Sequence, residues 1–183
     1  MQVSLPGLLS QLLLGLVNGS FYAILSLGLA VIFGLLNVIN FAHGALFMMG
    51  AVLTWMAMTY WNVSYWVMLV AAPVMVGLFG ILIERFLLRW IYKLDHLYGL
   101  LLTLGLTLLI EGAFRSFYGV SGLAYDTPES LEGAMNLGFM MLPKYRVWVV
   151  VASLVVCFAT WFVIEKTRLG AYLRAGTENP RLV

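Results

Sequence analysis

Charged side chains are scarce in this chain of 183 residues. Only 10% of the residues are Asp, Glu, Lys or Arg, whereas 63% are hydrophobic. A soluble domain carries roughly 25% charged and about 45–50% apolar residues, and no soluble core could bury this much apolar surface. The net charge of +2 is too small to indicate a nucleic-acid partner. The composition therefore excludes a soluble globular domain and predicts a protein whose partner is the lipid bilayer.

Cysteine and catalytic signatures are also scarce. The single cysteine, Cys157, lies in an apolar run and cannot form an intrachain disulfide. The sequence contains no HExxH, GxSxG or Walker A motif and no paired cysteines. Its two histidines, His43 and His96, are far apart and have no ligand-type neighbours at metal-binding spacing. We therefore expect no catalytic residue, no metal site and no cofactor bound by this chain, so any ATP would bind to another subunit.

Long apolar runs dominate the chain instead. About 20 consecutive apolar residues are needed to cross the hydrocarbon core of a bilayer. The first run has no basic residue before it and no small-residue cleavage site after it, so we interpret it as a retained helix rather than a signal peptide. The runs predict an all-α, polytopic transmembrane helical bundle in a single domain, 1–183. The expected spans are approximately 8–34, 45–60, 65–88, 98–118 and 147–164.

Basic residues between the spans predict which connections face the cytoplasm. They are densest after the third span and in the tail 165–183, so both segments are assigned to the cytoplasm. The connection 119–146 is then extracytoplasmic, and we expect a short surface helix around 128–135. The N-terminus lies outside if the second span crosses the membrane. It lies inside if 37–60 only dips in and returns, and the sequence leaves both open.

The segment 37–44 places two amides, an imidazole and a glycine between two apolar runs. Such polar segments persist at membrane depth only where they are buried in protein or line a water-filled cavity. Two interpretations remain open. The segment is either an interfacial loop whose Asn40 caps the next helix, or a broken helix that lines a translocation path. In the second case the candidate path residues are Asn37, Asn40, His43 and Gly44.

Two further residue pairs carry predictions. Glu111 and Arg115 have the i,i+4 spacing, with Glu first, that favours a salt bridge on one helix face. This pair either holds the helix end or places Glu111 beside a pathway, and we keep Glu111 among the candidate path residues. Gly15 and Gly19 form a GxxxG motif, which lets helices approach closely and predicts helix packing.

Several segments have sequence motifs similar to those of one known family. They are 15–22, 25–29, the phrase NFAHG at 40–44 with 49–51, the helix at 102–111 and the tail 167–180. Together they resemble the permease subunits of branched-chain amino-acid ABC importers over nearly the whole chain. The NFAHG phrase is closer to the H-type subunit than to its M-type partner. The tail is similar to the cytoplasmic segment that leads into the ATPase-docking helix of that family.

The resemblance implies a membrane-spanning permease subunit, not an enzyme, in a bacterial or archaeal cytoplasmic membrane. The importer would be ATP-driven, dependent on a binding protein, and specific for branched-chain or related amino acids. Transport of urea or short amides, and a non-transporting scaffold fragment, are the alternatives. The implied partners are an M-type permease subunit, two ABC ATPase subunits that hydrolyse the ATP, and an extracytoplasmic substrate-binding protein.

The resemblance also implies which tail residues belong to the ATPase-docking segment. These are Gly170, Arg174, Ala175, Glu178 and Asn179. Members of the family continue beyond the helix start that Asn179 and Pro180 would form. The chain is therefore expected to be truncated at its C-terminus and to represent roughly the first half of an importer permease.

Overall fold

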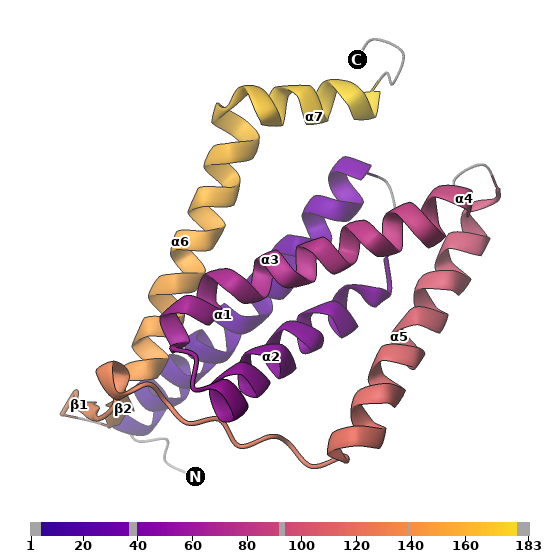
Figure 1. Cartoon of the computed structure of the whole chain (residues 1–183). Helices are drawn as coiled ribbons and strands as arrows, with labels where there is room; N and C mark the ends of the chain where they lie inside the picture. Colours follow the sequence, from indigo (N-terminus) through magenta and orange to yellow (C-terminus); the bar gives the residue numbers. More distant parts are fainter. Residues whose placement is uncertain (1–4, 37–39, 92–93, 139, 179–183) are drawn as a thin grey trace. The chain divides into compact units, whose positions relative to one another are not determined.

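The computed structural model describes residues 5–36, 40–91, 94–138 and 140–178, and most of them are helical (Figure 1). Five of the described helices are long and apolar enough to cross a membrane. They confirm the predicted all-α, polytopic class and cover the five expected apolar ranges. They are α1 (Leu5–Leu36), α2 (Ala42–Trp61), α3 (Tyr65–Ile83) with its extensions η1 (Glu84–Leu88) and α4 (Arg89–Ile91), α5 (His96–Tyr118), and α6 (Lys144–Lys166).

The chain forms two compact units. The first unit comprises Met1–Leu36 and Thr127–Val183, and therefore contains α1, α6 and the tail helix α7 (Arg168–Glu178). The second unit comprises Asn37–Asp126 and contains α2 to α5.

In the first unit α1 packs against α6. The buried residues on these helices are small or β-branched: Val17 and Ser20 on α1, Val149 and Ser153 on α6. Each serine hydroxyl donates to a carbonyl of its own helix, Ser20 to Val17 O at 2.6 Å and Ser153 to Val150 O at 2.9 Å. Small side chains whose hydroxyls are satisfied within the helix allow two membrane helices to lie close together.

The expected surface helix at 128–135 is present only as the single 3₁₀ turn η2 (Glu129–Leu131). Beyond that turn the prediction was wrong, because β1 (Ala134–Asn136) pairs antiparallel with β2 (Met141–Pro143). Gly133 and Gly138 have φ angles of +93° and +82°. Glycine adopts this left-handed backbone without steric penalty, which stops the helix and turns the hairpin.

In the second unit α2 and α3 form a tight antiparallel hairpin. Asn62 follows α2 with a φ of +50°, a conformation that asparagine tolerates better than most residues. The backbone N–H groups of Asn62 and Val63 both donate to Ala57 O, which ends the helix. Ala57, Met68 and Ala72 form the buried cluster between the two helices.

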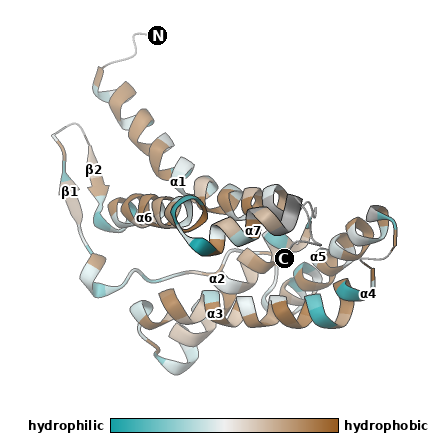
Figure 2. Ribbon diagram, turned by 90° about the horizontal axis from the view of Figure 1, so that it is seen from above, coloured by the Kyte–Doolittle hydropathy of each residue, from teal (hydrophilic) through white to brown (hydrophobic). Residues whose placement is uncertain are grey.

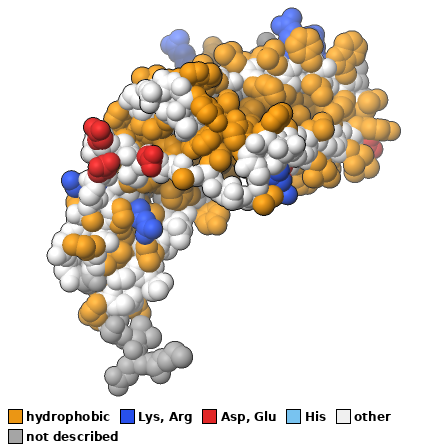
Figure 3. All heavy atoms as spheres, turned by 60° about the horizontal axis from the view of Figure 1, so that its bottom comes forward, with side chains coloured by type: hydrophobic (Ala, Val, Ile, Leu, Met, Phe, Trp, Pro, Cys, Tyr) orange, Lys and Arg blue, Asp and Glu red, His pale blue; other side chains and the backbone are white. Residues whose placement is uncertain are grey.

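Large apolar side chains point outward from both units. Leu12, Leu78 and Leu154 are 63%, 58% and 64% exposed although each lies within a long apolar helix. Figure 2 shows these helices as largely hydrophobic along their length, and hydrophobic side chains cover much of the face seen in Figure 3. A soluble protein rarely leaves apolar patches of this extent open. The helices therefore present surfaces suited to lipid and to neighbouring membrane helices.

Candidate functional site

The polar NFAHG motif, residues 40–44, forms the start of α2. The side chain of Asn40 accepts a hydrogen bond from Ala42 N–H at 2.9 Å, and Asn40 O accepts one from His43 N–H at 3.3 Å. These are the bonds of an N-cap residue, which satisfies N–H groups that have no partner inside the helix. The capping role that the first interpretation gave to Asn40 is thus present in the structure.

A second cap comes from a distant helix. Phe41 N–H donates to Thr103 Oγ1 at 3.3 Å. Thr103 is only 1% exposed, and its hydroxyl has Gly99 O and Leu100 O as acceptors at 3.0 and 3.1 Å. A hydroxyl carries one proton and two lone pairs, so it donates within α5 and still accepts from α2. Sequence reasoning missed Thr103, which only the fold brings to Phe41.

The contacts between α2 and α5 fix where α2 begins. The rings of Trp55 and Tyr118 lie 5.6 Å apart in an edge-to-face arrangement. Trp55 lies 14 positions after Phe41, and Tyr118 lies 15 positions after Thr103, so the two helices run in the same direction. Thr103 is the eighth residue of α5, which places it about 10 Å from the start of that helix at a rise of 1.5 Å per residue.

The capped start of α2 therefore lies within the length of α5 rather than level with its end. A helix start that lies within the hydrocarbon core of a bilayer finds no water for its backbone N–H groups and needs partners from the protein. Asn40 and Thr103 supply those partners. The first N–H groups of α2 are thus satisfied by protein groups from two different parts of the chain.

The remaining residues of the polar phrase occupy the first turn of α2. Ala42 and Ala45 are 1% and 2% exposed and form its packed side. His43 is partly buried, whereas Gly44 is exposed and has open space where a Cβ would be. Asn37, the other predicted path residue here, lies outside the described residues.

Glu111 lies two helical turns beyond Thr103 on α5. Its carboxylate is 3.6 Å from Arg115 Nη2, and the two side chains are 37% and 67% exposed. The predicted salt bridge is present, but the structure does not bring Glu111 next to Asn40. Over the part of the chain that the structure describes, no group of three or more His, Cys, Asp or Glu residues is arranged to hold a metal ion.

Gly15 and Gly19 lie on an exposed side of α1. Outside α1 itself, no described atom lies within 4 Å of the position a Cβ would take at either glycine. The buried positions of α1 are Val17 and Ser20 instead. A packing role for the GxxxG motif stays a prediction, and it would need a partner helix that the described residues do not supply.

The predicted docking segment is helical, which the sequence reasoning did not foresee. Thr167 precedes α7, and its Oγ1 accepts from Gly170 N–H at 3.4 Å while its carbonyl accepts from Ala171 N–H at 3.2 Å. Gly170 is buried, and a Cβ there would lie 2.5 Å from Ile164 C and closer still to Ile164 O. Ala175 is exposed.

The other three predicted docking residues lie in the second half of α7 and just beyond its end. Arg174 and Glu178 belong to α7 by their backbone, and Asn179 lies outside the described residues. Four of the five residues predicted to dock thus belong to one helix, and the structure gives Gly170 a packing role that the sequence alone did not show.

The fold and the polar helix start define a multi-pass α-helical membrane protein. Residues 11–183 match the family described as the permease component of branched-chain amino acid transport systems, and the chain belongs to this family. The predicted resemblance to H-type permease subunits is confirmed. No solved structure matches the chain.

Three similar proteins are high-affinity branched-chain amino acid transport system permease proteins. BraD from Pseudomonas aeruginosa is 26% identical over 95% of this chain. LivH from Escherichia coli K12 and LivH from Salmonella typhimurium are each 24% identical over 95% of this chain. The chain spans about 60% of the length of these curated relatives.

Proposed function

We propose that this chain forms part of the membrane pathway of an ATP-driven, binding-protein-dependent importer for branched-chain or related amino acids. The observation that carries the proposal is the family match over residues 11–183, together with relatives named as permease proteins of that transport. The importer would lie in a bacterial or archaeal cytoplasmic membrane. An M-type permease subunit, two ABC ATPase subunits and an extracytoplasmic binding protein complete it, and ATP is bound and hydrolysed by the ATPases, not by this chain.

Within that importer we assign the start of α2 to the translocation path. Its support is the depth of the Asn40 cap beside Thr103. Polar groups inside a bundle are typical of substrate routes. The amide of Asn40 and the imidazole of His43 are groups that can exchange hydrogen bonds with a polar solute. Gly44 keeps the surface beside them open, and Asn37 and Glu111 complete the proposed path residues.

We further propose that α2 crosses the membrane. It is one uninterrupted helix of 20 residues, and it runs in the same direction as α5. If the basic connection after α3 is cytoplasmic, α2 and α5 both run outward. The N-terminus and the connection 119–146 then lie outside, and the tail from residue 165 lies in the cytoplasm.

The tail would dock on an ATPase subunit through Arg174, Ala175, Glu178 and Asn179, with Gly170 setting the direction of α7. A permease contributes to such a cycle by making different contacts in two conformational states. Substituting Arg174→Ala and Glu178→Ala together should uncouple ATP hydrolysis from uptake and leave binding-protein affinity intact. Normal uptake by this double variant would remove the docking assignment.

The transport proposal is tested by reconstitution. The chain is co-expressed with the M-type permease, both ATPases and the binding protein of its source, and labelled leucine uptake into proteoliposomes is measured with ATP on the ATPase side. We expect uptake that requires this chain and ATP, and that valine and isoleucine inhibit. Uptake that is unchanged without the chain would refute the proposal. Competition by urea or short amides, but not by valine, would refute its substrate class.

A further inference from the structure

The tail helix α7 carries an exposed apolar stripe. Leu169, Tyr172 and Leu173 follow the i, i+3, i+4 spacing that places side chains on one side of a helix. They are 67%, 63% and 45% exposed. Arg168 and Ala175, which the same spacing places off the stripe, are also exposed. A short helix outside the long spans thus has one apolar side that the described residues leave largely open.

The end of α6 carries the residues of a membrane interface. Lys166 Nζ lies 5.8 Å from the centre of the Trp161 ring, and the Phe158 ring lies 5.5 Å from that of Trp161. Tryptophan and lysine gather where a span meets the headgroups. Only Thr167 separates the last residue of α6 from the first residue of α7. If α6 crosses the membrane, α7 therefore begins at the level of the lipid headgroups.

The corner between the two helices then directs α7. Gly170 packs against the backbone of Ile164 with no room for a Cβ, and Thr167 caps the new helix. As a result α7 runs crosswise to α6 instead of continuing its axis (Figure 1). Where a span runs close to the membrane normal, a helix that leaves its end crosswise lies along the membrane surface.

We propose that α7 is an interfacial helix whose apolar stripe, Leu169, Tyr172 and Leu173, binds the lipid surface. Amphipathic helices lie in the interface with the apolar side at the boundary between headgroups and acyl chains, and basic residues beside that boundary strengthen binding to anionic lipids. Lys166 and Arg168 are exposed beside the stripe and supply this charge. The proposal requires only that α6 spans the membrane, and it does not depend on what the protein transports.

Site-directed spin labelling tests this contact in the full chain. Cys157 is the single cysteine, so Cys157→Ser provides a background for single labels at positions 169, 171, 173 and 175. The labelled protein is reconstituted in vesicles of phosphatidylethanolamine and phosphatidylglycerol. Accessibility is then measured to oxygen, which concentrates in lipid, and to a nickel chelate, which stays in water. Labels at Leu154, 64% exposed on α6, and Val120, 89% exposed in a connection, serve as lipid and water references.

We expect the oxygen-to-nickel ratio to be severalfold higher at 169 and 173 than at 171 and 175. A helical circular dichroism spectrum that matches that of the unlabelled Cys157→Ser protein shows that each labelled protein is folded. If 169 and 173 meet nickel as readily as 175, the stripe faces water and the proposal is wrong. If 169 and 173 are shielded from both reagents, protein covers the stripe and the lipid contact is also refuted.

Discussion

The backbone N–H of Phe41 donates to the hydroxyl of Thr103, 62 residues further along the chain. This bond joins the start of α2 to the first half of α5. Together with the cap from Asn40, it satisfies N–H groups that a helix start otherwise leaves to water. The pair therefore explains how the NFAHG phrase can begin a helix within the depth of a bundle.

Removing the Thr103 acceptor should loosen this start. Thr103→Val keeps the shape of the side chain but leaves Phe41 N–H without its partner, and we expect a loss of about 0.6–2 kcal/mol in the free energy of unfolding. Unfolding of the purified protein in bicelles measures the loss, and amide exchange at Phe41 locates it. Thr107→Val is the matched control, because the Thr107 hydroxyl donates to Thr103 O within its own helix, α5. Equal losses for both variants would contradict the interhelical cap.

Asn40 should act through the same helix start. Asn40→Ala removes the cap on Ala42 N–H and is expected to destabilise the helix by about 0.5–2 kcal/mol, whereas Asn40→Ser retains a capping oxygen and should restore most of that loss. Amide exchange at Ala42 is the direct measurement. Combination with Thr103→Val should give a non-additive effect, because both caps serve adjacent amides. A serine variant as unstable as the alanine variant would show that Asn40 acts otherwise.

The junction between α6 and α7 should not accommodate a side chain at Gly170, even a single methyl group. Gly170→Ala would place a Cβ against Ile164 O and 2.5 Å from Ile164 C, so α7 must shift relative to α6. Distances between spin labels at positions 154 and 173 should change and broaden. Gly80→Ala in α3 is the control, because no described atom outside its own helix lies within 4 Å of its Cβ position. There we expect no loss, or a gain of up to about 1 kcal/mol from higher helix propensity.

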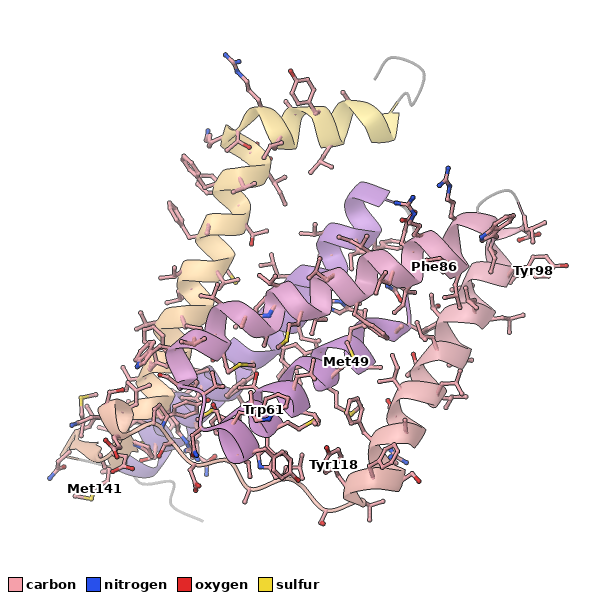
Figure 4. All side chains as sticks on the ribbon, in the orientation of Figure 1. Met49, Trp61, Phe86, Tyr98, Tyr118 and Met141 are labelled. Carbon is pink, nitrogen blue, oxygen red and sulfur yellow. The ribbon has the colours of Figure 1, made fainter. Side chains whose placement is uncertain are left out.

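The connection after α5 should depend on Trp55. Its indole N–H donates to Ala124 O at 2.8 Å, and Tyr125 O–H donates to Met58 Sδ at 3.1 Å. Trp55→Phe removes the first bond while keeping a ring beside Tyr118, and should raise amide exchange across 119–126 severalfold. Trp61 lies at the end of the same helix (Figure 4), and its side chain is 72% exposed, so Trp61→Phe should leave that exchange unchanged. Unaltered exchange in the Trp55 variant would show that this bond does not hold the connection.

Substituting each partner of the Glu111–Arg115 salt bridge distinguishes a structural role for Glu111 from a role in the translocation path. Exposed pairs contribute about 0–1 kcal/mol, so Glu111→Gln and Arg115→Gln should each change stability little. If Glu111 lines the path, only Glu111→Gln lowers amino-acid uptake in reconstituted vesicles. Equal uptake by the two variants would assign the pair to the helix end alone.

The sequence by itself determined the membrane class, the five apolar ranges and the family resemblance. Hydropathy is a property of consecutive residues, so a window of about 20 residues is enough to recognise a span. The i,i+4 spacing of Glu111 and Arg115, and the capping amide of Asn40, were likewise readable because both act within one or two helical turns.

Only the tertiary structure decided which distant groups meet. It places Thr103 beside Phe41 and sets α2 parallel to α5. It also packs Gly170 against Ile164, at the corner where the tail helix α7 begins. It also made a hairpin where a short surface helix was expected, because Gly133 and Gly138 take left-handed backbone angles. These outcomes depend on packing between segments far apart in the chain or on backbone angles, and local composition carries neither.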